Sequence, residues 1–178
     1  MKIPKLLLLL LLVSINALAK VPPFDAMKHQ IDGPSEQLRG LVTEAWSHMN
    51  PARPEHENDY DLAFDLNAKA YQLGHPEGAS NIGLLYEKGW GVVKDFDSAE
   101  QWYLRAIAGT YHSAQAELGL ARIYLSKTPT KENVDKIINY IKQARKTALV
   151  RGSLWEDGRN GYLYEADLLA AELESRTN

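Results

Sequence analysis

A repeat of 36 residues constrains the fold of this chain more than any other feature of its sequence. The segment Ile82-Gly83-Leu84 recurs as Leu118-Gly119-Leu120. The same spacing relates four further pairs, namely Ala63 with Ala99, Leu66 with Trp102, Ala70 with Ala106 and Gly78 with Ala114. Periods of roughly 20 to 50 residues are typical of arrays of stacked units, which bury a shared core and leave an extended surface for binding. The sequence therefore predicts a short solenoid.

The N-terminus has the pattern of a secretory signal peptide. Lys2 and Lys5 precede an apolar run from Leu6 to Val13, and Ala17-Leu18-Ala19 supplies the small residues of a cleavage site. The apolar run is shorter than the roughly 20 residues that cross a bilayer. We expect cleavage after Ala19, no stable membrane insertion of the mature chain, and a periplasmic or secreted location, with a Gram-negative periplasm preferred.

Composition narrows the classes of partner. The chain has no cysteine, so packing alone is expected to hold the fold together. Loss of residues 1–19 removes Lys2 and Lys5 and changes the formal net charge from -3 to -5. Nucleic acid favours a basic surface, and this acidic balance argues against such a partner. We expect a monomer that needs no cofactor.

Helical spacing of apolar residues predicts a series of helices along the mature chain. One is expected after Ser35, followed by a proline-rich loop up to residue 58. The next are expected at 59–73, from Pro76 to a stop at Gly89, after a cap formed by Asp97 and Glu100, and at about 112–125. A degenerate unit is expected from about 130, then a turn-rich stretch at 152–161 and a last helix at 162–174.

Three motifs carry a family resemblance. They are the loop Gly89-x-Gly91-Val92-x-Lys94, the helix Trp102-Tyr103-x-x-Ala106 and the helix Ala114-Gln115-x-x-Leu118-Gly119. Together they resemble Sel1-like repeats, the α/α relatives of tetratricopeptide repeats, over residues 59–126. The resemblance implies an all-α fold, an α/α solenoid of helical hairpins with about six or seven helices after removal of the signal peptide.

The expected organisation has four parts. Residues 1–19 form the signal peptide, 20–58 a lead-in with one helix and the proline-rich loop, 59–126 the repeats, and 127–178 a degenerate repeat with a capping helix. Small residues such as Gly83, Gly119 and Ala106 are expected to let helices approach closely, while Trp102 and Tyr103 fill the space between them. Trp46 and Trp102 lie on helical stripes and are expected in the core.

The resemblance also implies a class of function. Periplasmic Sel1-like proteins serve as adaptors, as regulators of envelope assemblies and, in some bacteria, as immunity proteins that neutralise a delivered toxin. We therefore expect a non-catalytic repeat protein that binds another protein, as an inhibitor or immunity protein that sequesters one partner such as an antibacterial effector. The alternative is a scaffold or regulator of an envelope assembly in motility, polysaccharide export or stress.

Three kinds of chemistry compete with this interpretation. The glycine loop at 88–94 follows a predicted helix, whereas a phosphate-binding loop follows a strand. The five histidines have no metal-ligand spacing. Carboxylates pair at Glu156-Asp157 and among Asp95, Asp97 and Glu100, so a hydrolase is a third alternative. We predict no enzyme, and no catalytic, cofactor-binding or metal-ligating residue.

Aromatic side chains are the candidate partner-binding residues. Trp90 and Trp155 each lie in a predicted loop beside glycines. Such aromatics either anchor protein interfaces or fold back to seal a gap between helices, and the sequence leaves both outcomes open. Tyr60 and Tyr111 complete the candidate set.

Overall fold

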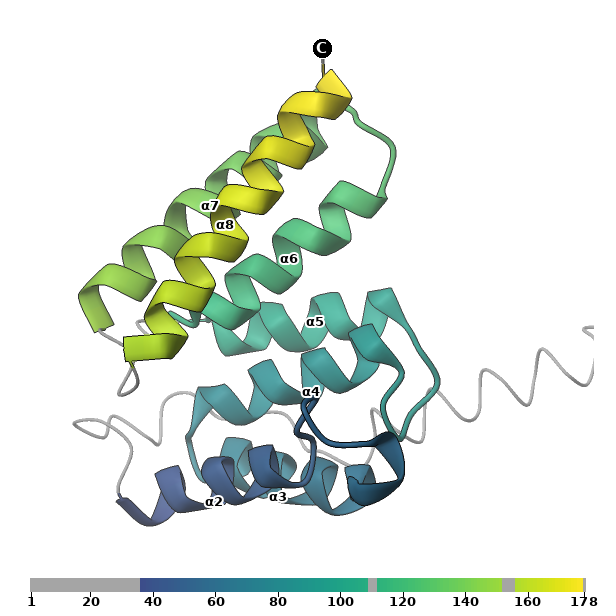
Figure 1. The fold of residues 1–178 in the computed structure, drawn as a ribbon, viewed down its shortest axis with the longest axis vertical. Helices are drawn as coiled ribbons and strands as arrows, with labels where there is room; N and C mark the ends of the chain where they lie inside the picture. The colour runs from purple at the N-terminus through teal and green to yellow at the C-terminus, as the bar shows by residue number, and fades with distance from the viewer. Residues whose placement is uncertain (1–35, 109–111, 152–155, 178) are drawn as a thin grey trace, which may run out of the picture.

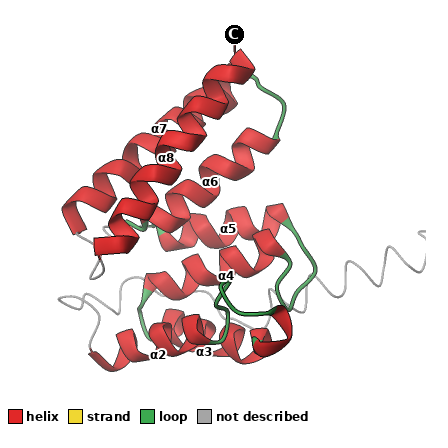
Figure 2. Ribbon diagram, viewed as in Figure 1, coloured by secondary structure: helices red, strands yellow, loops and turns green. Residues whose placement is uncertain are grey.

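The chain folds into α-helices joined by short loops, with no strand in the described ranges 36–108, 112–151 and 156–177 of the computed structural model (Figure 1; Figure 2). The helices are α2 (Glu36–Ser47), α3 (Tyr60–Gln72), α4 (Pro76–Lys88), α5 (Phe96–Ala106), α6 (Ala114–Ser126), α7 (Lys131–Arg151) and α8 (Glu156–Thr177), with a 3-10 turn η1 at Glu55–Glu57. The predicted all-α class is confirmed, and the seven α-helices in the described ranges agree with the expected number.

Neighbours in sequence are neighbours in space throughout the described chain. Each helix packs against the next, and α2, α4, α6 and α8 also contact one another in succession. The odd-numbered helices make no comparable contacts with one another among the described residues. The even-numbered helices therefore lie closer to one another than the odd-numbered helices do. Figure 1 shows α2 and α3 at one end and the α7–α8 pair at the other.

Helix ends follow local chemistry, with one correction to the sequence-based prediction. Pro76 occupies the first turn of α4, and Gly89 ends that helix in the left-handed conformation, both as expected. The cap of α5 is Asp95, two residues before the predicted Asp97. A carboxylate oxygen of Asp95 accepts the Asp97 N–H at 3.0 Å, because the extended backbone at residue 95 lets its side chain reach back over the first turn.

The C-terminal part departs further from the prediction. The stretch 152–161 was expected to be turns, yet α8 begins at Glu156 and continues to Thr177, beyond the predicted 162–174. Gly158 and Gly161 lie inside this helix. A glycine costs a helix only about 1 kcal/mol relative to alanine. The helix therefore continues through both glycines, and α8 packs against α6 and α7.

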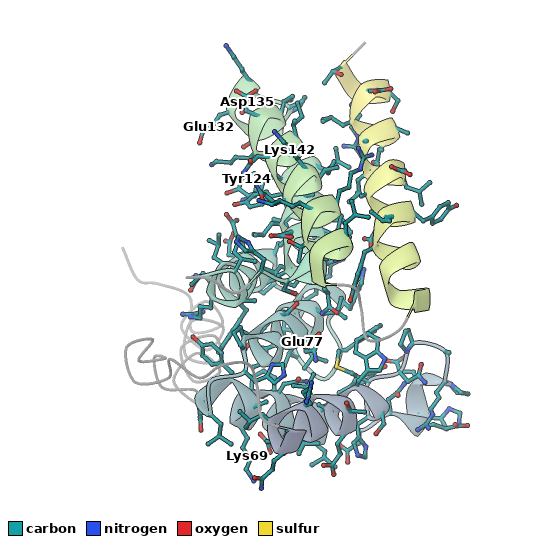
Figure 3. The ribbon with its side chains drawn as sticks, turned by 90° about the vertical axis from the view of Figure 1, so that its left-hand side faces the viewer. Lys69, Glu77, Tyr124, Glu132, Asp135 and Lys142 are labelled. Atoms are coloured by element: carbon teal, nitrogen blue, oxygen red, sulfur yellow. The ribbon has the colours of Figure 1, made fainter. Side chains whose placement is uncertain are left out.

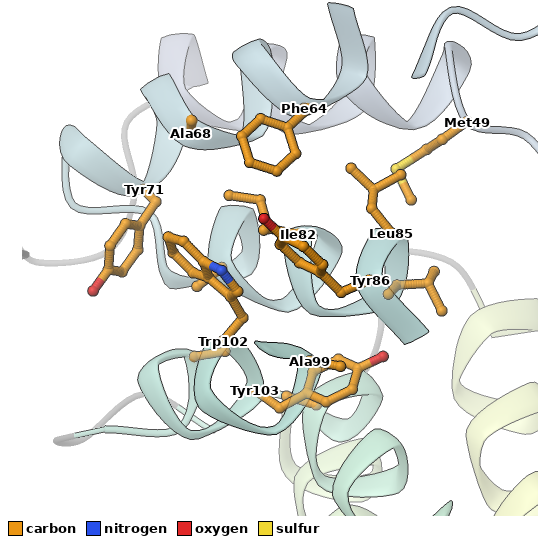
Figure 4. Close-up of a cluster of buried hydrophobic side chains, with 14 of the residues drawn as sticks. Met49, Phe64, Ala68, Tyr71, Ile82, Leu85, Tyr86, Ala99, Trp102 and Tyr103 are labelled. Atoms are coloured by element: carbon orange, nitrogen blue, oxygen red, sulfur yellow. The ribbon is translucent and has the colours of Figure 1, made fainter. Parts of the chain in front are cut away.

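Two clusters of buried side chains form the core. The first draws on α3, α4, α5 and α6 and on Met49 just after α2, and Figure 4 shows several of its members, including Phe64, Tyr86 and Trp102. The second lies between α6, α7 and α8 and includes Leu118 of α6, Ile141 of α7 and Leu169 of α8. Both clusters draw on α6, which explains why that helix is buried nearly all round.

The two tryptophans expected in the core differ in their burial. Trp102 is 2% exposed, which confirms its prediction. Trp46 is 39% exposed, so its prediction was wrong. The reason lies in the position of α2 at the end of the described helices, where it packs on one side only and buries Leu38 and Ala45, with Met49 buried just after its end. Trp46 follows Ala45 and therefore turns about 100° away from that narrow buried stripe.

The repeated glycines meet at one aromatic ring. Tyr103 of α5 is fully buried, and a Cβ on Gly83 of α4 would lie 2.6 Å from its ring. A Cβ on Gly119 of α6 would lie 2.4 Å from the same ring. Side-chain carbons do not approach this closely, so each position accepts only glycine without a shift of the ring. The two glycines of the 36-residue period therefore place α4 and α6 on either side of Tyr103 of α5.

Candidate partner-binding site

The loop between α4 and α5 is held tightly against the end of α4. The N–H groups of Gly89 and Trp90 both donate to the carbonyl of Leu85, at 2.8 and 3.0 Å. The Asp95 N–H donates to the carbonyl of Tyr86 at 3.0 Å, so the end of the loop is hydrogen-bonded back to α4. These bonds fix the backbone on both sides of Trp90.

The loop brings two of the predicted residues together. The rings of Tyr60 and Trp90 stack with centroids 5.6 Å apart and planes 12° from parallel. Both side chains are half-buried and pack against the first core cluster. Gly91 permits this approach, since a Cβ there would lie 2.5 Å from the Cβ of Tyr60 and the residue has a φ of 68°.

A shallow pocket of about 370 Å³ opens beside the stacked rings. Its lining residues come from the proline-rich loop, η1, the start of α3 and the end of α4, and are Pro51, Arg53, Glu55, Tyr60, Lys88, Gly89 and Trp90. Arg53 and Lys88 are the two cations of this lining and Glu55 its one anion. We call the pocket and the stacked pair the aromatic edge. Its amphipathic rings and mixed charges suit contact with a protein surface.

The structure places only part of the predicted set. Tyr111 and Trp155 lie outside the described residues. Sequence reasoning missed Arg53 and Lys88, which join the edge through a loop of 50–58 and the end of α4. Their charge was visible in the sequence, and Lys88 lies two residues before Trp90, but the proximity of Arg53 to Trp90 depends on how the 50–58 loop packs beside the end of α4.

Buried ionisable groups gather at a second place, between α4, α5 and α6. Arg122 donates from Nε and Nη2 to the two carboxylate oxygens of Glu87, at 2.8 and 2.7 Å. The hydroxyl of Tyr103 donates to Glu87 at 2.7 Å, and the ammonium of Lys88 at 3.0 Å. Arg122 also pairs with Glu165 of α8. This polar cluster links four helices.

The partners of Glu87 reverse the effect of its burial. Burial alone raises the pKa of a carboxyl group, but the hydrogen bonds and charge of Arg122, with donors from Tyr103 and Lys88, lower the pKa of Glu87 to about 2. Burial and the nearby Glu87 carboxylate raise the pKa of Tyr103 well above its ordinary value. Both groups therefore keep one protonation state near neutral pH, which suits a structural tie better than proton transfer.

A chain of hydrogen-bonded side-chain amides connects α3, α4 and α6. Asn67 donates to the carbonyl of Ala63 at 2.8 Å and accepts from Asn81 at 2.9 Å. Asn81 in turn accepts from Gln115 of α6 at 3.0 Å. The side-chain oxygen and nitrogen of both asparagines thus find partners in α3, α4 or α6, so the chain ties these helices in register.

Two of the carboxylates considered for hydrolysis, Asp95 and Glu100, have structural partners. Asp95 caps α5, and Glu100 accepts from Tyr124 at 2.6 Å and from Lys127 at 2.7 Å. Glu156 and Asp157 fall in the first turn of α8, although their side chains lie outside the described set. Within the described residues, no three histidine, aspartate or glutamate side chains group in a way that could hold a metal ion.

No helix in the described part of the chain combines the length and apolar character needed to cross a bilayer. The sequence matches no protein-family model, and no solved structure matches the chain at a significant level. The aromatic edge is therefore the candidate partner-binding site of this chain.

Proposed function

We propose that this chain is a Sel1-like α/α repeat protein that binds one partner protein through the aromatic edge. The 36-residue period supports the repeat assignment, since Gly83 and Gly119 occupy equivalent places on either side of Tyr103. The observation that carries the binding proposal is the Tyr60–Trp90 stack beside a pocket with two cations. Rigid, half-buried aromatics lose little side-chain entropy on binding and are frequent anchors of interfaces.

We further propose that the protein acts as a periplasmic inhibitor or immunity protein, which sequesters a partner such as an antibacterial effector and performs no catalysis. Its few helical pairs present a short surface that suits one partner better than the assembly of many. The Sel1-like motifs and the signal-like N-terminus support this role. The fixed loop backbone around Trp90 also supports tight binding, because the edge is organised before the partner arrives.

Crosslinking in periplasm followed by purification of the full-length product tests the number of partners. We expect one stoichiometric partner, which is then expressed and titrated against the purified protein. Several weaker partners would favour a scaffold of an envelope assembly. Turnover of a substrate without any stable partner would contradict the proposal.

A pair of tryptophan variants tests the surface. Trp90→Ala is expected to weaken binding of the purified partner at least tenfold, which corresponds to about 1.4 kcal/mol, because it removes one ring of the stack. Trp46→Ala is the matched control, since Trp46 is a partly exposed tryptophan on α2 that does not line the pocket. Isothermal titration measures both. Equal affinity of the Trp90→Ala variant and the unchanged protein would remove the aromatic edge from the interface.

The immunity role makes a separate prediction about location. Cells that express the full chain are expected to survive a delivered effector, and cells that express residues 20–178 behind a new start methionine are expected to die. Survival in competition assays provides the measurement, with immunoblots to show equal protein levels. Protection by the version without residues 1–19 would contradict a periplasmic site of action.

A further inference from the structure

Helix α7 has a charge opposite to that of the rest of the chain. Its 21 residues contain six lysines and arginines against one glutamate and one aspartate, a net charge of +4. The whole chain has a net charge of -3, so the residues outside α7 sum to -7. Its second half, from Lys142 onward, has four of the six cations and no acid.

The outward side of α7 combines some of these cations with exposed apolar residues. Ile137, Ile141, Ala144 and Ala148 form the buried stripe. On another side of the helix, Ile138 is 52% exposed and Leu149 is 63% exposed. Eleven residues separate them, close to three full turns, so they lie on one line along the helix with Lys142 and Arg145 between them. We call these four residues the α7 stripe.

Two of the lysines of α7 have no ion-pair partner among the described residues, although Lys136 pairs with Glu132. Arg145 pairs with Asp167 of α8, but neither Lys142 nor Lys146 lies within ion-pair distance of an acid among the described residues. Both lysines are exposed, and Figure 3 labels Lys142 on α7. The two are four residues apart and therefore lie on neighbouring turns of the same side.

Helix α8 offers a useful contrast. It also exposes large apolar residues. Leu168 is 52% exposed, and the exposed Tyr164 lies one turn before it. However, Glu165, Asp167 and Glu172 of α8 each pair with an arginine of this chain. The outward side of α7 thus has exposed apolar residues beside lysines that are not paired with an acid among the described residues. In α8, the exposed apolar residues lie beside acids that are already paired with arginines.

We propose that the α7 stripe, together with Lys146, is a docking surface for an acidic amphipathic helix of a partner protein. Ile138 and Leu149 would contact the apolar side of that helix, and Lys142 and Lys146 would pair with its flanking carboxylates. Helices recognise one another in this way through anchors spaced along one face. Complementary charge at the rim sets the orientation and the rate of association.

Two other occupants fit the surface less well. A second copy docked stripe to stripe would bring Lys142 and Lys146 of two chains together, and like charges at an interface are unfavourable. A membrane-surface helix needs a continuous apolar face. The continuous apolar face of α7 is buried against α6 and α8, which leaves only Ile138 and Leu149 as its large exposed apolar residues in the described set.

This surface is distinct from the aromatic edge, since the pocket there is lined by residues 51–90 only. Its test is therefore independent of the proposed function. The full mature chain is titrated against a fluorescein-labelled synthetic helix of about 20 residues, with leucines on one face and glutamates on both flanks, and fluorescence anisotropy measures binding. A second peptide has the same leucines with lysines on the flanks.

We expect the acidic peptide to bind and the basic peptide to bind at least tenfold more weakly. The variant Ile138→Ser with Leu149→Ser is expected to lower affinity for the acidic peptide at least tenfold. Leu168→Ser is the matched control, because Leu168 has the same 52% exposure as Ile138 but lies on α8. Lys142→Glu with Lys146→Glu is expected to reverse the preference between the two peptides, and circular dichroism confirms that each variant is folded.

Four outcomes would overturn the proposal. They are no binding of the acidic peptide, equal loss of binding in the Leu168→Ser variant, binding of vesicles rich in anionic lipid that the Ile138→Ser and Leu149→Ser changes abolish, and a dimer in analytical ultracentrifugation that the same changes dissociate. Failure of the Trp90→Ala test would leave these expectations unchanged.

Discussion

Tyr103 is the single residue on which the repeat and the polar cluster both depend. Its ring lies between Gly83 and Gly119, and its hydroxyl donates to Glu87 at 2.7 Å. A buried tyrosine of this kind combines a large apolar contact with one polar partner. Tyr103 therefore helps to set the spacing of α4, α5 and α6, through its ring and through its hydrogen bond to Glu87.

Adding a methyl group at either glycine tests this spacing. Gly83→Ala and Gly119→Ala are each expected to destabilise the protein by about 1–3 kcal/mol, because the new Cβ meets the ring of Tyr103. Gly40→Ala is the control, since a Cβ there has no neighbour within 4 Å and alanine favours a helix. Urea denaturation measures all three. A neutral effect at Gly83 and Gly119 would show that the ring moves aside freely.

Glu87 makes stability depend on pH in a defined direction. Its pKa is lowered to about 2 from an ordinary 4.5, so its contribution is complete above about pH 5 and is lost as the pH falls toward 2. The difference corresponds to about 3 kcal/mol. Glu87→Gln is therefore expected to destabilise the protein at pH 7 and to flatten the loss of stability between pH 5 and 2. Glu44→Gln, at an exposed position of α2, is the control.

Helix ends show how local chemistry and packing share the work of defining an element. Asp95 begins α5 through a side-chain bond to the Asp97 N–H and a second bond from the Ser98 hydroxyl at 2.6 Å. Gly89 ends α4 because its φ of 75° is strained for other residues. In α8, by contrast, Gly158 lies inside the helix, at a cost of only about 1 kcal/mol relative to alanine.

The cap of α5 can be tested by a pair of substitutions. Asp95→Ala is expected to cost about 1 kcal/mol, because it leaves N–H groups of the first turn without a protein acceptor. Asp97→Ala keeps the cap and removes only an acid from the first turn, so its cost is expected to be about half of that or less. Thermal denaturation compares them. A larger effect at Asp97 would restore the assignment made from the sequence.

The array as a whole consists of neighbour contacts around two core clusters. The first cluster draws on α3 to α6 and on Met49 just after α2, and the second spans α6 to α8, so α6 is the shared element. In such arrays, stability is approximately a sum over units and the interfaces between them. A destabilising substitution at one end is therefore expected to destabilise the helices at the other end less.

Leu169→Ala tests this expectation at the C-terminal end. Leu169 is buried in the second cluster, and its truncation is expected to cost about 2–5 kcal/mol. Hydrogen exchange should accelerate more in α7 and α8 than in α3 and α4, because only the former pack in that cluster. Ile82→Ala in the first cluster should produce the opposite pattern. Uniform acceleration in both variants would show one cooperative unit.

Sequence reasoning located most elements because helices leave periodic patterns in the chain. The boundaries of α3, α4 and α6 agree with the prediction within two residues, and the repeated glycines lie where close packing requires them. The exposure of Trp46 was missed because the pattern of one helix does not reveal that α2 packs on one side only.

Apolar periodicity and glycine spacing along the chain were sufficient to determine the helical class and the order of the helices, since both depend on residues within one or two turns of each other. Tertiary structure alone decided that Tyr60 stacks on Trp90, that Glu87 meets Arg122 across 35 residues, and that α7 exposes Ile138 beside its cations. These contacts depend on the angle and register between helices, which no short segment of sequence encodes.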